Sequence, residues 1–106
     1  FAIYNADSSE YATAKLANTA SATIATTITI PEGGICISAC SHSDDPARSS
    51  SWTNLTERYD TIYDVYSTQT GASDAFESTQ TNRVITTTFS AAPDNAGMVT
   101  VSWDKA

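Results

Sequence analysis

The sequence predicts an all-β protein, an antiparallel β-sandwich of the Greek-key or jelly-roll type with about seven to nine strands. Three observations predict it. Thr and Ser make up 17 and 14 of the 106 residues, whereas Glu, Lys, Leu and Gln, which favour helices, are scarce. Turn-forming clusters recur about every ten to fifteen residues. The segments between them alternate apolar and polar side chains, as strands with one buried face do.

The chain has the length of one domain. Residues 1–22 are predicted to be an N-terminal arm or an edge strand, and residues 23–106 the sandwich itself. Within the first part, the Ala and Thr mixture of residues 11–20 favours an edge strand over a short helix. Turns are predicted at residues 5–7, 31–34, 43–46, 70–71 and 93–97, where Gly, Pro, Asn and Asp gather.

Residues 23–30 form the clearest predicted strand, because Ile24, Ile28 and Ile30 share one face and threonines occupy the other. Residues 35–40 are apolar or small on both faces. This second pattern is typical of a central strand that is covered on both sides.

Residues 59–66 are also predicted as a strand, because β-branched and aromatic side chains dominate them. Alternation places Tyr59, Tyr63 and Val65 on one face. In residues 83–90, Ile85 and Phe89 point one way while Val84, Thr86 and Thr88 point the other.

Residues 98–103 complete the predicted sheet, with Val99, Val101 and Trp103 as the inward set. Together these registers predict a buried core. Its members are Ile28, Ile30, Ile35, Ile37, Ile85, Phe89, Val99 and Val101.

The net charge of the chain argues against two classes of binding partner. A net charge of −7 argues against nucleic acid, which is bound through clustered Lys and Arg, and against an anionic membrane surface. No apolar run reaches the length of a transmembrane helix. Because the chain starts at Phe1 and not at Met, it is expected to be a processed form or a fragment.

Cys36 and Cys40 are four residues apart. In a regular strand they lie on one face but roughly 13 Å apart, which exceeds the reach of a disulfide. We therefore expect two reduced, buried thiols. The alternative is a disulfide across a bend near Ser38 or Ala39.

No motif in the sequence indicates an enzyme, a cofactor site or a metal site. His42 lies in a polar stretch, residues 41–43, without a nucleophile-elbow motif, so we expect a partly exposed loop residue with no catalytic partner. Five carboxylates lack the spacing of a calcium loop and are interpreted as solvated acids. They are Asp44, Asp45, Asp60, Asp64 and Asp74.

Two binding or modification features remain as alternatives. Asn54-Leu55-Thr56 matches the acceptor for N-glycosylation, which makes Asn54 the candidate glycosylation site. Four aromatic residues could instead form a platform for a sugar, although a small sandwich more often buries such side chains in its core and rim. They are Trp52, Tyr59, Tyr63 and Tyr66.

Several stretches of the sequence resemble one family. They are TTITIPEGGICIS at 26–38, WTNLTE at 52–57, Gly71-Ala72-Ser73, VITTTF at 84–89 and GMVTVSW at 97–103. In this order they resemble the small β-sandwich domains of tailed-phage virion proteins and of related secreted surface proteins. The resemblance covers roughly residues 23–103 and brings no catalytic residues with it.

The resemblance implies a non-enzymatic structural protein of a virion surface, such as a capsid decoration protein or a tail or fibre module. Its partners would be other copies of itself and other assembly proteins. The alternatives are an extracellular filament or pilus subunit joined by strand donation, and a carbohydrate-binding module. Phe1, Ile3 and Tyr4 make the N-terminus apolar, so this segment is predicted to contact a neighbouring subunit.

Overall fold

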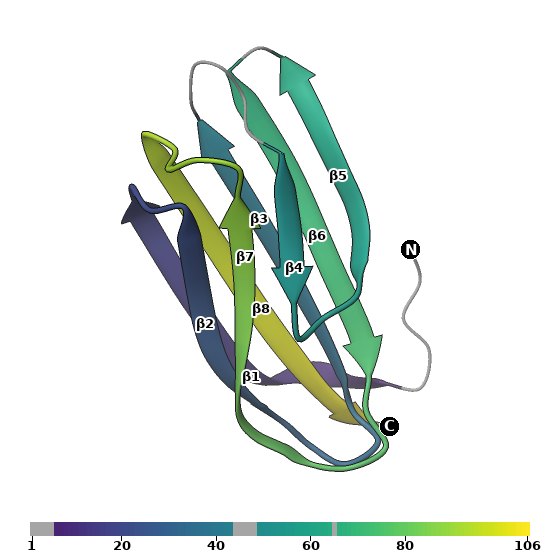
Figure 1. The fold of residues 1–106 in the computed structure, drawn as a ribbon. Coiled ribbons are helices and arrows are strands. Elements are labelled where there is room, and N and C mark those ends of the chain that lie inside the picture. The colour runs from purple at the N-terminus through teal and green to yellow at the C-terminus, as the bar shows by residue number, and fades with distance from the viewer. Residues whose placement is uncertain (1–5, 44–48, 65) are drawn as a thin grey trace.

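The structure, a computed structural model, describes residues 6–43, 49–64 and 66–106, and in these ranges the chain forms eight β-strands and no helix (Figure 1). The strands are β1 (Ala6–Thr19), β2 (Thr23–Ile30), β3 (Ile35–Ser43), β4 (Ser50–Thr53), β5 (Glu57–Asp64), β6 (Ser67–Ala75), β7 (Gln80–Phe89) and β8 (Asn95–Lys105). They build a five-stranded sheet, ordered β1-β8-β3-β6-β5, and a three-stranded sheet, ordered β2-β7-β4. The predicted antiparallel β-sandwich is confirmed.

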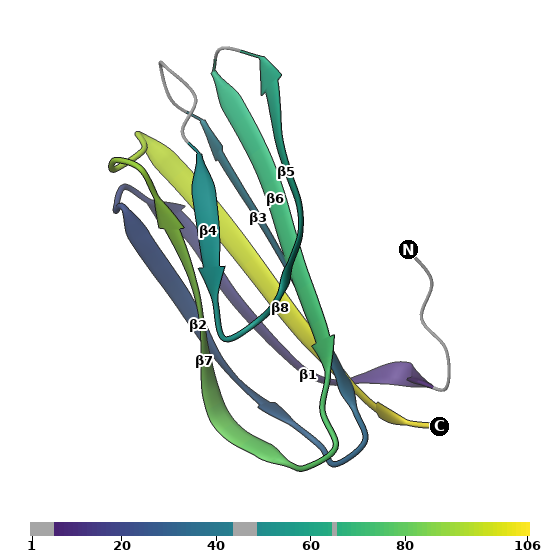
Figure 2. The ribbon, with the colours of Figure 1, turned by 45° about the vertical axis from the view of Figure 1, so that its right-hand side comes forward.

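The connectivity is that of a jelly roll. β1 pairs with β8, β2 with β7 and β3 with β6, all antiparallel, so the first three strands run beside the last three like one long hairpin. β8 also pairs with β3, and β7 also pairs with β4, which rolls this hairpin into two layers. Figure 2 shows the smaller sheet lying over the larger one, with β5 at the edge of the larger sheet.

The three-stranded sheet follows the alternation that its sequence predicts. Ile24, Ile28 and Ile30 of β2 are buried, and so are Ile85 and Phe89 of β7. Threonines cover most of the opposite, solvent-facing side of β2 and β7. The orientation predicted for these two strands is confirmed.

The five-stranded sheet reverses the orientation that was predicted for β8. The buried side chains of β8 are Ala96, Met98, Thr100 and Ser102, each exposed by 3% or less. Val99 points outward and is 42% exposed, and Val101 and Trp103 are half-buried on the same outward side. The prediction that Val99, Val101 and Trp103 face the core is therefore wrong.

β3 was predicted to be covered on both faces, and the structure covers only one of them. Cys36, Ser38, Cys40 and His42 are buried against the smaller sheet, and Ile35 and Ile37 stand half-buried on the outer side. Of the eight predicted core residues, four are fully buried and four point outward. The buried four are Ile28, Ile30, Ile85 and Phe89, and the outward four are Ile35, Ile37, Val99 and Val101.

A hydroxyl cluster explains why β8 and β3 turn their small polar residues inward. The Thr100 hydroxyl lies 2.6 Å from that of Thr26 and 2.7 Å from that of Ser38, and Ser38 also donates to the Val99 carbonyl at 3.0 Å. Buried hydroxyls are tolerated when they are hydrogen-bonded to one another or to backbone. The two sheets therefore meet through paired hydroxyls as well as through isoleucines.

Of the predicted turns, the one at residues 31–34 is confirmed and the one at 70–71 is wrong. The one at 93–97 is partly wrong, because β8 already begins at Asn95. At residues 31–34, Gly34 N donates to Pro31 O at 3.0 Å and Gly33 has φ +75°, as the third residue of a tight turn requires. Gly71, predicted in a turn, lies inside β6, and the ring of Tyr59 covers it. A strand glycine can mark close approach by a neighbouring group, and here that group is an aromatic ring.

The ends of the sheets match the remaining strand predictions. Residues 11–19 belong to β1, an edge strand with register shifts near Glu10, and residues 59–64 belong to β5. The predicted turns at 5–7 and 43–46 lie partly outside the described residues. In the part of the chain that the structure describes, no helix of a kind that could cross a membrane is found.

Candidate functional site

The outer face of the five-stranded sheet, the side turned away from the smaller sheet, is the candidate functional site. Residues opposite one another on neighbouring strands share a face, so the register arranges the outward side chains in rows. One row consists of Lys15, Val99, Ala39, Gly71 and Tyr59 and crosses all five strands.

Two neighbouring rows make one half of this face apolar. The first contains Val101 and Ile37, and the second contains Trp103 and Ile35. These two rows and the row from Lys15 to Tyr59 together form the apolar half of the face. We define it by its larger side chains, which are Ile35, Ile37, Tyr59, Val99, Val101 and Trp103. Val99 and Tyr59 are 42% and 44% exposed. Monomeric soluble proteins rarely expose a large contiguous apolar patch unless it has a function.

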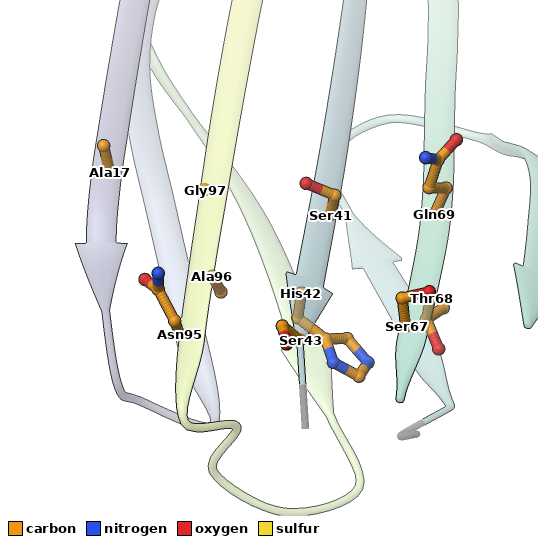
Figure 3. A pocket seen from close by; sticks show the side chains of 10 residues that line it. All are labelled: Ala17, Ser41, His42, Ser43, Ser67, Thr68, Gln69, Asn95, Ala96 and Gly97. Carbon is orange, nitrogen blue, oxygen red and sulfur yellow. The ribbon is translucent and has the colours of Figure 1, made fainter. Parts of the chain in front are cut away.

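The other half of the outer face is polar. Ser41 and Gln69, and Ser43 and Ser67, are opposite one another on β3 and β6. Together with Asn95 of β8 they line an open hollow of about 370 Å³ near the ends of β1, β8, β3 and β6 (Figure 3). The side chains there offer hydroxyl and amide groups, and His42 of β3 also borders the hollow.

A second hollow of about 380 Å³ lies where the two halves meet. Small residues, Ala39, Ser41 and Gly97, form its floor, and Tyr59 and Val99 stand beside them. The face therefore carries bulky apolar rows next to a depression.

The centre of the outer face is also neutral. In a chain with a net charge of −7, the outward positions of β3 and β6 carry no formal charge, and those of β8 carry one, Lys105 at the end of the strand. Further charges lie on the edge strands: Glu10 of β1 is opposite Trp103, Lys15 of β1 is opposite Val99, and Arg58 of β5 hydrogen-bonds to Ser73 and forms a 3.2 Å ion pair with Asp74.

His42 lies in a strand, not in the partly exposed loop that was predicted. It is 4% exposed in β3, and its ring packs edge-on against Phe89 with 4.8 Å between the ring centroids. Alternation sends Ser41 and Ser43 to the opposite face of the strand. The two serines adjacent to His42 in sequence therefore point away from its ring.

Cys36 and Cys40 are free and buried, as predicted. They face inward from β3, at 0% and 4% exposure. Burial raises the pKa of the Cys36 and Cys40 thiols from 9.0 to about 12, because a thiolate is poorly solvated there. Such thiols are chemically inert at neutral pH.

Two of the five carboxylates interpreted as solvated acids, Asp60 and Asp74, have local hydrogen-bonding partners. Asp74 accepts hydrogen bonds from Thr56 N at 2.7 Å and from Arg58 Nη2 at 3.2 Å, and Asp60 accepts one from Ser50 N at 3.3 Å. Partial burial and the Asp60 charge raise the pKa of Glu57. Among the described residues no three His, Cys, Asp or Glu side chains gather as metal ligands do. Asp44, Asp45 and the Asp64 side chain lie outside the described residues.

Asn54, the candidate glycosylation site, is exposed but tied to β7. Its φ of 72° is left-handed, its Nδ2 donates to Val84 O at 2.7 Å, and its carbonyl accepts from Arg83 Nε at 3.0 Å. The side-chain nitrogen to which a glycan is attached thus has a structural hydrogen bond. Glycosylation stays a prediction.

The four aromatics predicted as an alternative sugar platform do not share one surface. Trp52 packs against the core, and its indole N–H donates to Thr70 Oγ1 at 2.7 Å. Tyr59 lies on the outer face, and Tyr66 is exposed at the turn between β5 and β6. The side chain of Tyr63 is outside the described residues, as are Phe1, Ile3 and Tyr4 of the predicted interface.

Sequence reasoning missed the apolar half as a surface, although a signal for it was present. Residues 35–40 are apolar or small on both faces, and this was interpreted as a strand covered on both sides within one domain. The structure covers one side, and the other carries Ile35 and Ile37. The same pattern is equally compatible with a strand whose second face is covered by another molecule.

Comparison with known protein families, with curated proteins and with solved structures finds no match to this chain.

Proposed function

We propose that this chain is a non-enzymatic structural subunit that acts by packing the outer face of its five-stranded sheet against other proteins of a larger assembly. The observation that carries the proposal is the composition of this face. Six large apolar side chains gather there, while the inner face of the same sheet presents mainly hydroxyls, thiols and small residues, with Leu16, His42 and Met98 as its larger side chains.

An isolated soluble domain rarely gathers its large apolar side chains on one solvent-facing side. Each such side chain gains about 1.5–3 kcal/mol when it is fully buried, so covering even part of this face drives association. No acidic residue stands at the outward positions of β8, β3 and β6, so the acidic charge that keeps the free subunit soluble does not obstruct the contact at its centre.

The kind of assembly follows only from the resemblance. A virion surface, as a decoration, tail or fibre module, is the first choice, and an extracellular filament is the alternative. A filament joined by strand donation would use an exposed sheet edge. The neutral, apolar outer face favours packing between faces over pairing at edges.

Radical footprinting tests the proposal. The chain is oxidised by hydroxyl radicals in the native assembly of its source, and again as purified chain diluted until its mass is that of a monomer. We expect Tyr59 and Trp103 to be oxidised at least about fivefold less in the assembly. Tyr66, which is 55% exposed at the turn between β5 and β6 and is not part of the apolar half, is the control and should change by less than about twofold. Equal oxidation of Tyr59 and Trp103 in both states would contradict the proposal.

A further inference from the structure

The apolar half of the outer face needs an occupant, and we infer that a second copy of this chain covers it, outer face against outer face, in a two-fold dimer. This inference rests on the proposed function and names its first partner. Three properties of the face support a second copy: its neutrality, its self-complementary relief and its size.

Neutrality is the first property. Two identical molecules with a net charge of −7 repel each other, and they can dock only where their charges do not meet. The outward positions of β3 and β6 carry no formal charge, and those of β8 carry only Lys105, at the end of the strand. A face built for a basic partner would instead present acidic side chains there.

Relief is the second property. The rows of Val101 and Ile37, and of Trp103 and Ile35, project beside the hollow floored by Ala39, Ser41 and Gly97. A two-fold axis brings the same patch of both molecules together, so a ridge of one meets a hollow of the other twice. A ridge next to a depression is the shape that such a contact requires.

Size is the third property. β3 has nine residues, which gives a length of about 30 Å, and five strands spaced about 4.8 Å apart span roughly 19 Å. The whole outer face therefore measures roughly 600 Å², before the relief of the side chains is added. A contact centred on the apolar half and extending over this face approaches the ~800 Å² per partner of a standard stable interface. Two sheets packed face to face would keep ordinary sandwich spacing, about 10 Å.

The structure offers a matched pair of valines for the test. Val99 is 42% exposed on the outer face, and Val84 is 45% exposed on the solvent face of the smaller sheet. Val99→Lys and Val84→Lys therefore make the same chemical change on strands at nearly equal exposure. Because the contact is two-fold, Val99→Lys places two lysines in each interface.

The measurement is molar mass against concentration, by sedimentation equilibrium or light scattering. The wild-type chain and Val84→Lys should approach twice the 11.2 kDa of one chain, with similar dissociation constants. For Val99→Lys we expect the dissociation constant to rise at least a hundredfold. Val99→Thr keeps the β-branched shape and should raise it about tenfold, so it decides the matter if circular dichroism shows Val99→Lys unfolded.

Three results would overturn the inference. The wild-type chain could stay monomeric at concentrations of several hundred micromolar, Val99→Lys and Val99→Thr could dimerise as the wild type does, or Val84→Lys could weaken the dimer equally. None of these results decides the proposed function. Protection of Tyr59 and Trp103 in the native assembly, with a monomeric purified chain, would assign the face to a different protein partner.

Discussion

The two sheets of this jelly roll divide their side chains in opposite ways. The smaller sheet turns isoleucines inward and threonines outward, whereas the larger sheet turns Ser, Thr, Cys and His inward and Ile, Val, Trp and Tyr outward. The smaller sheet thus has the pattern of a sheet with one face in the core of the domain and the other face in solvent. The larger sheet carries large apolar side chains on the side that the domain itself leaves uncovered, as the proposed packing against other proteins requires.

The difference also separates two sources of stability. Isoleucines of the smaller sheet stabilise the fold by leaving water, without a geometric requirement beyond close packing. Hydroxyls of the larger sheet contribute only while each one has its hydrogen-bonding partner. The first contribution depends on buried area and the second on the register of distant strands.

The largest expected effect is that of removing an isoleucine from the smaller sheet. Ile85 is fully buried, so Ile85→Ala should lower the free energy of unfolding by about 2–5 kcal/mol through lost burial and a residual cavity. Val84→Ala, at the adjacent exposed position, is the control and should cost under about 1 kcal/mol. Chemical denaturation measures both. A cost below about 1 kcal/mol at Ile85 would show that this sheet does not carry the core.

An intermediate effect is expected from pH, through the thiols of the larger sheet. The unfolded chain loses its thiol protons near pH 9, whereas burial keeps the pKa of Cys36 and Cys40 at about 12 in the folded chain. Above pH 9 the unfolded state therefore binds fewer protons, and stability falls as pH rises.

Each thiol contributes about 1.4 kcal/mol of this loss per pH unit, so roughly 2–3 kcal/mol should disappear between pH 8 and pH 10. The Cys36→Ala, Cys40→Ala double variant starts from a different baseline but should show a flatter profile over this range. Identical slopes for both proteins, measured by urea denaturation at each pH, would contradict the burial of these thiols.

The smallest effect should come from the hydroxyl cluster. Thr100→Val leaves Thr26 without its partner at 2.6 Å and should cost about 1–2 kcal/mol. Thr27→Val, on the solvent face of β2, is the control and should stay within about 0.5 kcal/mol.

The double variant Thr26→Val, Thr100→Val sharpens this comparison. When both partners become apolar, no buried hydroxyl of this pair is left unsatisfied, so the double variant should be less destabilised than the sum of the two single variants. Simple additivity in a double-mutant cycle would mean that the two hydroxyls do not interact.

The sequence by itself determined the fold class and the position of most strands. β-branched residues, alternation and the turn at residues 31–34 are local properties, and they suffice where one set of alternate positions is plainly apolar. Ile24, Ile28 and Ile30 face threonines across β2, so only one orientation of that strand removes large apolar area from water. The same holds for Ile85 and Phe89 in β7.

Only the tertiary structure decided which way β3 and β8 face. In each of these strands, the odd-numbered residues and the even-numbered residues are both compatible with facing the core. Shifting the strand by one residue exchanges the inward set and the outward set, and the local sequence pattern fits either arrangement. Thr100 faces inward because Thr26 and Ser38, 74 and 62 residues away in sequence, supply its hydrogen-bonding partners. With Thr100 facing inward, Val99, Val101 and Trp103 face outward and form part of the candidate site. The local sequence of β8 does not predict this orientation, because the hydrogen-bonding partners of Thr100 lie on other strands.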